Sequence, residues 1–271
     1  NTIITKSEMN LLSEFWLNFF LDETDQVDKI NLFSWSHICL LLSTLAIGIF
    51  MYIKREQLKQ WKWKEKFRYV LAALFFVNML FLYLFFILKG VYSWKLHLPL
   101  HLCFISGYLL MYVLITGNQK LFRAVYFFTW VGPLHAMIWP NTPMRADRFL
   151  SYQFVISHHI LLLAGLYCLF VLEYPVVFKD IKKAFLLGNI IFVSVFVFNN
   201  LFGTNYIMTN TLPPHIIKLF PFLQYLNIPI LWLEICGVAM MFIAYIPAGI
   251  WNHSNYKLPV SSDIAKANAL S

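Results

Sequence analysis

Residues 67–89, FRYVLAALFFVNMLFLYLFFILK, decide the fold class of this chain. Positions 69–88 carry no charged side chain, and a helix of roughly 20 apolar residues crosses the ~30 Å hydrocarbon core of a bilayer. The apolar residues follow one another directly, whereas the strands of a membrane β-barrel alternate apolar and polar residues. The stretch therefore predicts a transmembrane helix.

Runs of the same kind recur along the 271 residues, of which 60% are hydrophobic and 13% charged. Soluble domains are nearer half apolar and about a quarter charged. The fourth run is the shortest and Gly132-Pro133 interrupts it, so six or eight crossings are alternatives to seven. We predict an all-α, polytopic membrane protein with a bundle of seven transmembrane helices. The predicted spans are residues 33–53, 67–89, 98–116, 121–139, 150–172, 184–203 and 223–250.

The distribution of basic residues predicts the orientation of the bundle. Fourteen of the 21 Lys and Arg residues fall on one side of the predicted spans, and seven of these lie between residues 54 and 68. Because Lys and Arg favour cytoplasmic loops, we expect the N-terminus outside and the C-terminus in the cytoplasm of a multi-pass cell-membrane protein. The basic loop is expected to rest on anionic lipid headgroups. The net charge of +8 therefore does not require nucleic acid as a partner.

Three regions are expected along the chain. Residues 1–32 form an acidic extracytoplasmic segment without a cleavable signal pattern, and its amphipathic stretch at 11–21 suits the membrane surface. Residues 33–251 form the transmembrane domain, and residues 252–271 form a polar cytoplasmic tail. The cysteines are widely spaced within predicted spans, which excludes a disulfide framework and a CxxC metal motif. They are Cys39, Cys103, Cys168 and Cys236.

Polar side chains gather in the outer ends of the predicted helices, whereas the inner halves are almost purely apolar. Ionisable groups are costly in hydrocarbon and usually face a bundle interior or a wet cavity. Several helices contribute them at similar depth, so we expect an outward-facing cavity. A purely structural hydrogen-bond network is the alternative. The histidines concerned are His37, His97, His101, His135, His158 and His159, and the other polar residues are Asn199, Asn200, Asn205, Tyr206, Asn227 and Glu234.

Cys103 is the candidate nucleophile. It lies in LPLHLC, residues 98–103, about one turn into the predicted helix, with Pro99 in the first turn. The positive end of the helix dipole favours a thiolate, and a histidine base would activate it further. On one helix His101 would point to nearly the opposite face from Cys103, so the base is expected from another helix. A small apolar filler is the alternative reading of this cysteine.

Two adjacent histidines are candidates for that base. His158 and His159 lie about 100° apart on a helix, so at most one points to the cavity centre, and imidazole suits acid–base chemistry near neutral pH. Glu234 is the only acidic residue placed inside the hydrocarbon, and near a histidine it would orient the imidazole. Asn227 lies on the same face. Three further polar side chains near the outer ends are Asn200, Asn205 and Tyr206. They are suited either to donate hydrogen bonds to an oxyanion or a lipid headgroup, or to satisfy the backbone groups of broken helix ends.

Histidine spacing also raises the question of a metal. His97 and His101 are four residues apart and would share a helix face, but no HExxH pattern accompanies them. We expect neither a metal nor another cofactor. A metalloenzyme that uses His101, His135 and His158 as metal ligands is a further hypothesis.

Three short motifs carry a resemblance to a known family. LPLHLC at 98–103, ISH at 156–158 and LFGTNY at 201–206, in this order and spacing, resemble the bacterial YwaF-like membrane proteins, which are grouped with the transmembrane protein 164 family. The likeness spans roughly residues 35–250. It implies a seven-helix protein and, in the animal relative, a cysteine/histidine acyltransferase that acts on phospholipid acyl chains.

The resemblance also implies site residues. The family cysteine falls on Cys103 and the later histidine on His158, but His159 stands where bacterial relatives often have Gly, so the choice between the two histidines stays open.

The leading hypothesis is acyl transfer or acyl hydrolysis on an outer-leaflet phospholipid or lipid-anchored substrate. Cys103 attacks the ester, His158 or His159 moves the proton, Glu234 orients the imidazole, and Asn200 or Asn205 holds the oxyanion. The alternative is a transporter or receptor with a small polar or amphiphilic ligand in the same cavity. The oligomeric state is not indicated. The residues expected to contact substrate are His101, His135, Asn200, Asn205, Tyr206 and Asn227.

Overall fold

Every regular element in the described part of the chain is a helix. The structure, a computed structural model, describes residues 16, 19, 20, 34–138, 148–212, 214–226 and 229–255. The predicted surface helix at 11–21, for the most part, and the tail beyond 255 lie outside these residues. The elements are α2 (Trp35–Ile53), α3 (Arg55–Lys59), α4 (Lys64–Leu88), α5 (Trp94–His97), α6 (Leu102–Thr116), α7 (Gln119–Ile138), α8 (Phe149–Phe170), α9 (Asp180–Phe202), η1 (Tyr206–Met208), α10 (Pro214–Leu219), α11 (Leu223–Leu226) and α12 (Pro229–Asn255).

Five helices in the described part of the chain, α4, α7, α8, α9 and α12, are long and apolar enough to cross a membrane. Helices α2 and α6 are apolar but shorter. The prediction of an all-helical membrane protein is therefore confirmed. The count of seven crossings and the orientation of the termini stay predictions.

Two predicted helices begin later than expected, and each of these boundaries lies near a proline. The third was expected from residue 98, but Leu98 and His101 both have extended backbone, and α6 begins at Leu102. Pro99 disfavours helical backbone at Leu98, the residue before it. The seventh was expected from residue 223, but that segment is the separate helix α11, and α12 begins at Pro229. Proline suits a first helical position because it has no N–H to donate.

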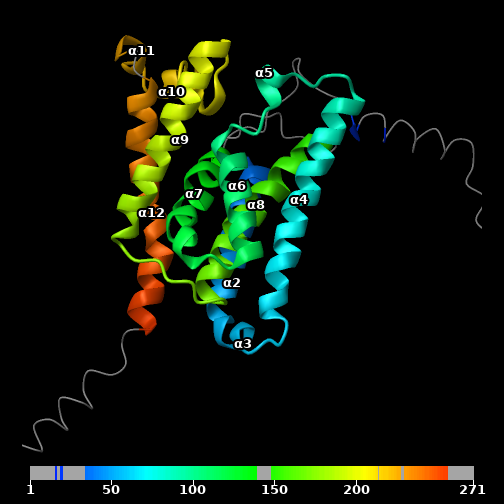
Figure 1. Ribbon diagram of the computed structural model, residues 1–271, viewed down its shortest axis with the longest axis vertical. Coiled ribbons are helices and arrows are strands. Elements are labelled where there is room, and N and C mark those ends of the chain that lie inside the picture. The colour runs from blue at the N-terminus through cyan, green and yellow to red at the C-terminus, as the bar shows by residue number, and fades with distance from the viewer. Residues whose placement is uncertain are drawn as a thin grey trace, which may run out of the picture.

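Helix α7 lies at the centre of the bundle. It contacts α6, α8, α9 and α12, and in Figure 1 it lies between the α9–α12 pair and the remaining long helices. Phe122, Tyr126 and Phe127 are each 0% exposed, although they lie on more than one face of the helix. A helix that is apolar all round is normally buried. The short fourth span, which continues through Pro133, is thus the core of the bundle.

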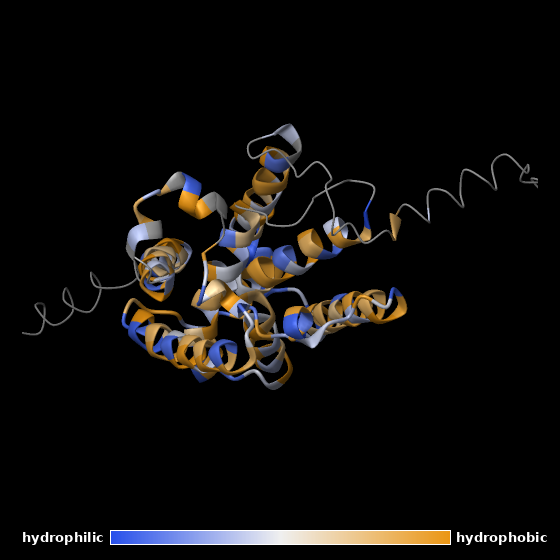
Figure 2. Ribbon diagram, turned by 90° about the horizontal axis from the view of Figure 1, so that it is seen from above, coloured by the Kyte–Doolittle hydropathy of each residue, from blue (hydrophilic) through white to orange (hydrophobic). Residues whose placement is uncertain are grey.

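The outer faces of the long helices are apolar. Phe76 and Phe81 on α4 and Leu186 and Val193 on α9 are each about half exposed or more, and the view along the bundle shows most helical turns coloured as hydrophobic (Figure 2). Soluble monomers rarely expose apolar surface of this extent. Hydrocarbon solvates such a surface, which agrees with the membrane assignment.

Gly165 on α8 allows close contact with α7. An added Cβ at this position would lie 2.5 Å from Thr129 Oγ1 and 3.3 Å from Thr129 Cβ. Thr129 is fully buried, and its hydroxyl donates to the Tyr126 carbonyl oxygen at 2.7 Å. The added Cβ would therefore meet a buried, branched side chain that a hydrogen bond holds in place. Small residues allow this kind of backbone approach between membrane helices.

Replacing Gly165 with alanine is expected to destabilise the protein by about 1–3 kcal/mol, the usual cost of overpacking a filled core. A thermal-melting measurement in detergent checks this. The matched control is Gly237→Ala on α12, where an added Cβ meets nothing within 4 Å and alanine is the better helix former. Equal melting temperatures for the two variants would contradict the prediction.

A buried ion pair joins the central helix to α9. Arg123 Nε lies 2.7 Å from Asp180 Oδ2, and the Val177 N–H donates to the same carboxylate oxygen at 3.0 Å. Asp180 is 0% exposed, whereas the Arg123 side chain is 30% exposed. Lys183 Nζ also approaches the carboxylate, at 3.3 Å, but from the surface.

Asp180→Asn keeps an acceptor for Val177 and removes the charge. Removing one partner of a buried pair typically costs about 3–5 kcal/mol, and the partial exposure of Arg123 places the expected loss at the lower end of this range. Chemical denaturation in mixed micelles measures it. Lys183→Ala, which removes only the exposed partner, should cost less than about 1 kcal/mol. A larger loss for Lys183→Ala than for Asp180→Asn would contradict this account.

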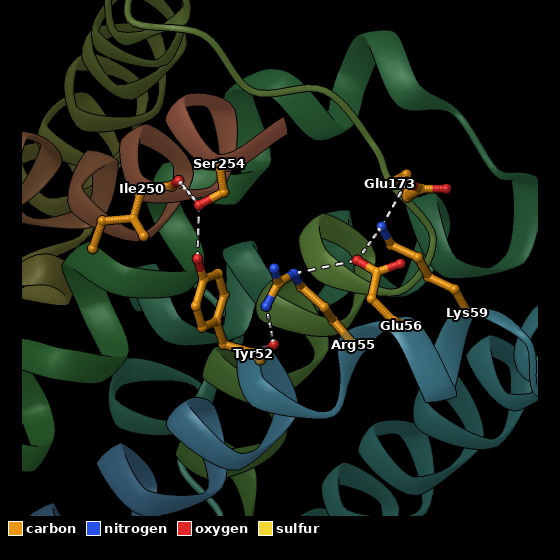
Figure 3. A network of polar contacts seen from close by, with 7 residues as sticks. All are labelled: Tyr52, Arg55, Glu56, Lys59, Glu173, Ile250 and Ser254. Carbon is orange, nitrogen blue, oxygen red and sulfur yellow. Dashed lines mark hydrogen bonds and ion pairs between the residues drawn. The ribbon is translucent and has the colours of Figure 1, made fainter. Parts of the chain in front are cut away.

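A polar network joins elements at the end of the bundle that contains α3, opposite to α5 and α10 (Figure 1). Lys59 Nζ lies 2.9 Å from Glu173 Oε1 and 3.1 Å from Glu56 Oε1, which ties α3 to the α8–α9 connection. Tyr52 Oη and Ser254 Oγ are 2.8 Å apart and tie α2 to α12. Figure 3 shows these contacts together. The network holds the basic connection between α2 and α4 against the bundle.

Candidate functional site

A cavity of about 440 Å³ lies among the helices, with walls from α4 to α9, η1 and α12. Most of its wall is apolar, with Phe75 and Met79 on α4 and Trp232 and Met240 on α12 as examples. A largely apolar pocket with a few convergent polar groups is the usual form of a ligand site. The polar residues that line it are His97, His101, Cys103, His135, Gln153, Ser157 and His158, and Cys236 adds a second thiol.

Cys103 lies at the start of α6 and lines this cavity. Because the helix begins at Leu102, Cys103 is in its first turn, where backbone N–H groups have no intrahelical acceptor. The prediction that Cys103 lies about one turn into the helix, after Pro99, was wrong for the reason given above. The correction places the thiol closer to the positive end of the helix than the sequence indicated.

His101 is not on a helix with His97 or Cys103. It is the residue before α6, with extended backbone (φ −71°, ψ 147°), whereas His97 ends α5. The predicted shared helix face of His97 and His101 is therefore wrong, and so is the expectation that His101 and Cys103 point apart on one helix. His101 and Cys103 line the same cavity. The Ile207 N–H donates to His101 Nδ1 at 3.4 Å, so the neutral ring carries its proton on Nε2.

His158 lines the cavity and has one ring nitrogen without a hydrogen-bond partner among the described residues. The ring is buried, and its Nδ1 lies 2.6 Å from the Phe154 carbonyl oxygen and 3.2 Å from Ser157 Oγ. A carbonyl oxygen only accepts, so Nδ1 carries the proton and Nε2 has a lone pair. Among the described residues, Nε2 is buried without a hydrogen-bond partner. An oriented imidazole with a free basic nitrogen is the arrangement that a general base needs.

His159 faces a different helix. Its Nδ1 lies 2.8 Å from the Val155 carbonyl oxygen, and its Nε2 lies 2.8 Å from Thr44 Oγ1 and 3.2 Å from Ser43 Oγ on α2. It does not line the cavity. The angle between adjacent residues on a helix thus directs His158 to the cavity and His159 to α2. Within the described ranges, no hydrogen bond joins Cys103 Sγ to His158 Nε2.

Several other predicted site residues are not brought to the cavity. Glu234 accepts a hydrogen bond from Asn189 Nδ2 at 3.4 Å and does not line the wall. Asn200 Nδ2 donates to the Phe196 carbonyl oxygen at 2.7 Å, within its own helix. Asn227 lies outside the described residues. His135, by contrast, lines the cavity from α7.

Asn205 stabilises its own loop. Its Nδ2 donates to Thr211 Oγ1 at 2.6 Å, and its Oδ1 accepts the Thr211 N–H at 3.2 Å. Tyr206 is also structural: its hydroxyl accepts the Leu98 N–H at 3.0 Å and donates to the Trp94 carbonyl oxygen. Burial raises the pKa of the Tyr206 hydroxyl, so it stays protonated and keeps donating. These contacts hold the connection between α5 and α6 in place.

A strained turn follows α9 and forms part of the wall. Ile207 and Met208 have positive φ angles of 56° and 62° and both line the cavity. Such backbone is uncommon outside glycine and persists where the surroundings hold it. Asn199, 0% exposed, does this: its Nδ2 donates to the Tyr206 carbonyl oxygen and to Thr209 Oγ1, each at 2.8 Å. The turn delivers the Ile207 N–H to His101.

Two residues of the site were missed by reasoning from the sequence. Gln153 lies four residues before Ser157, which also lines the cavity, so the two residues share a face of α8. Gly132 on α7 packs against the start of α6, and an added Cβ would lie 3.3 Å from the Cys103 backbone nitrogen. A Gly-Pro pair inside an apolar run is the signal of such close packing.

The metal reading finds no ligand group in the described part of the chain. No three His, Cys, Asp or Glu side chains lie close enough there to hold an ion. His101, His135 and His158 line one cavity without converging on a common point of coordination.

Comparison with known proteins gives one match. A family model with the description TMEM164 family matches residues 32–245, which is most of the chain and includes every described residue that lines the cavity. No curated protein and no solved structure matches.

Proposed function

The chain belongs to the TMEM164 family, and we propose that it is a membrane-embedded enzyme that transfers or hydrolyses the acyl group of a lipid ester through Cys103 and His158. One observation carries the proposal. The buried His158 ring holds its proton on Nδ1 and leaves Nε2 without a partner, in the same cavity as a thiol at a helix N-terminus. A base and a nucleophile in one enclosed pocket are the two groups that acyl transfer needs.

The first half of the reaction acylates the cysteine. His158 Nε2 takes the proton of the Cys103 thiol, and the sulfur attacks the ester carbonyl carbon. The carbonyl electrons move to oxygen, and the tetrahedral oxyanion then collapses and breaks the bond to the alcohol oxygen. The imidazolium returns its proton to that oxygen, so the alcohol leaves and a thioester remains on Cys103.

The second half returns the thiol. An acceptor alcohol, or water, gives its proton to Nε2 and attacks the thioester carbonyl carbon, and collapse expels the Cys103 thiolate, which regains the proton. Alcohol as the acceptor makes the protein a transferase and water makes it a hydrolase. Catalytic hydrogen bonds are often long before substrate binds, so we expect the thiol to reach Nε2 in the loaded pocket.

The shape and composition of the cavity support a lipid substrate. Its apolar walls on α4 and α12 suit an acyl chain, and most of its polar side chains lie between α5 and α8. α5, which contributes to the wall, is at the end of the bundle opposite the basic α3 connection (Figure 1). With the orientation expected from the basic residues, the pocket receives phospholipid or a lipid-anchored substrate from the outer leaflet.

Trapping an acyl-enzyme tests the proposal. Purified protein is incubated with a phospholipid that carries labelled acyl chains, quenched in acid and digested, and the Cys103 peptide is analysed by mass spectrometry. We expect a label that neutral hydroxylamine removes, as it removes thioesters. A lipid that binds saturably but is recovered intact, with no label on Cys103, would favour the transporter or receptor reading instead.

A further inference from the structure

Gln153 has a buried side-chain amide that takes no part in the mechanism proposed above. It lies on α8 at 8% exposure and lines the cavity. Its backbone carbonyl accepts a hydrogen bond from Asn78 Nδ2 at 3.5 Å, but its side-chain Nε2 is buried without a partner in the described part of the chain. Proteins rarely leave a buried donor unpaired, because the unmade bond costs the full desolvation of the group. The cavity is the place where a ligand would supply the acceptor.

The helix places this amide with the reacting groups. Gln153, Ser157 and His158 line the same cavity from α8, and Cys103 lines it from α6. The side-chain hydrogen bonds of Ser157 and His158 end on the Phe154 carbonyl oxygen. Gln153 therefore brings an uncommitted neutral donor to the cavity that Cys103 and His158 also line.

We propose that Gln153 binds the carbonyl oxygen of the lipid ester by donating a hydrogen bond from Nε2, and that this bond strengthens as the oxygen becomes negative. The second part rests on the acyl-transfer function proposed above. We assign the ester carbonyl oxygen as the acceptor because the hydrocarbon of the acyl chain has none. A neutral amide donor also suits a neutral carbonyl oxygen, since neither group needs a counter-charge. A fixed donor aimed at a developing oxyanion is usually a large contribution to catalysis in a dry site.

This assignment replaces the amides expected from the sequence. Asn200 Nδ2 is bonded to the Phe196 carbonyl oxygen, and Asn205 Nδ2 is bonded to Thr211. Neither residue lines the cavity. An oxyanion donor must have a hydrogen atom that is not already bonded, and of these three amides only Gln153 both lines the pocket and has a side-chain nitrogen without a partner among the described residues.

Binding in the absence of reaction tests the first part. In a Cys103→Ala background, native mass spectrometry measures the affinity for a diacyl phosphatidylcholine and for the dialkyl ether lipid of the same chain length, which lacks the carbonyl oxygen. We expect an ester preference of about five-fold, the usual effect of one neutral hydrogen bond. The further change Gln153→Met, which keeps the length of the side chain and removes the donor, should abolish it. The control is Ser151→Ala, since Ser151 is buried on the same helix but does not line the cavity. This change should leave the ester preference intact.

Reaction rates test the second part with Cys103 intact. Gln153→Met should slow ester-driven acylation of Cys103 by about 100-fold or more and leave its alkylation by iodoacetamide unchanged, because alkylation forms no oxyanion. A retained ester preference when Gln153→Met is added to Cys103→Ala, or no preference in Cys103→Ala alone, overturns the proposal. Equal slowing of acylation and alkylation also overturns it, since Gln153 would then only shape the pocket.

The same measurements separate this inference from the proposed function. If Cys103 is never acylated but the ester preference depends on Gln153, carbonyl binding stands and the acyl-transfer function fails. If Cys103 is acylated at equal rates with and without the Gln153 amide, the function stands and the role of Gln153 fails.

Discussion

Cys103→Ala is expected to reduce the rate of release of labelled fatty acid or its transfer from phospholipid by at least about 10³-fold, because no other group forms the thioester. The measurement is the initial rate in detergent micelles at saturating lipid, normalised to protein that elutes as a single species. Stability should change little, because alanine fills most of the space of this side chain and the cavity lies beside it.

Cys39→Ala is the matched control, since this exposed thiol on α2 lies outside the cavity, and it should keep full activity. Undiminished turnover by Cys103→Ala would refute the cysteine mechanism. So would transfer of the acyl label to Cys236, the other thiol of the cavity, in both the unsubstituted and the Cys103→Ala proteins.

The second large effect distinguishes two neighbouring histidines. His158→Asn should lower kcat/KM by about 10²- to 10⁴-fold, the usual contribution of a general base. It should also slow iodoacetamide alkylation of Cys103, because thiolate formation then has no proton acceptor. This response to an alkylating reagent separates the base from Gln153, whose loss should leave alkylation unchanged.

His159→Asn is the internal control for that experiment. It removes the contact of Nε2 with Thr44 on α2, so we expect a small loss of thermal stability and nearly full kcat/KM. Equal losses of activity in the two variants, or a loss confined to His159→Asn, would show that the proton acceptor has been misassigned.

Most of the helices could be predicted from local sequence. The run at 67–89 becomes α4, and the run at 150–172 becomes α8, because a continuous apolar segment in hydrocarbon must satisfy its own backbone hydrogen bonds. The boundaries that failed were those at Pro99 and Pro229. There the proline controls one or two residues of backbone, and hydropathy, which is averaged over many residues, does not detect it.

The candidate site was predicted only in part. Cys103, His101, His135 and His158 line the cavity, since polar groups in apolar helices turn to the interior. Glu234 was expected to orient the histidine, but its contact is with Asn189, because α12 presents that face to α9. Depth along a helix can be read from the sequence, whereas the direction of a side chain around the axis depends on which helices pack beside it.

The sequence by itself determined that this protein is a helical membrane protein, because the hydrophobic length of a segment is a property of that segment alone. Only the tertiary structure decided that His158 rather than His159 lines the cavity, and that Gln153 Nε2 has no hydrogen-bond partner among the described residues. Each of these depends on helices distant in the chain. A rotation of 100° or a missing acceptor is set by packing, and no local pattern encodes it.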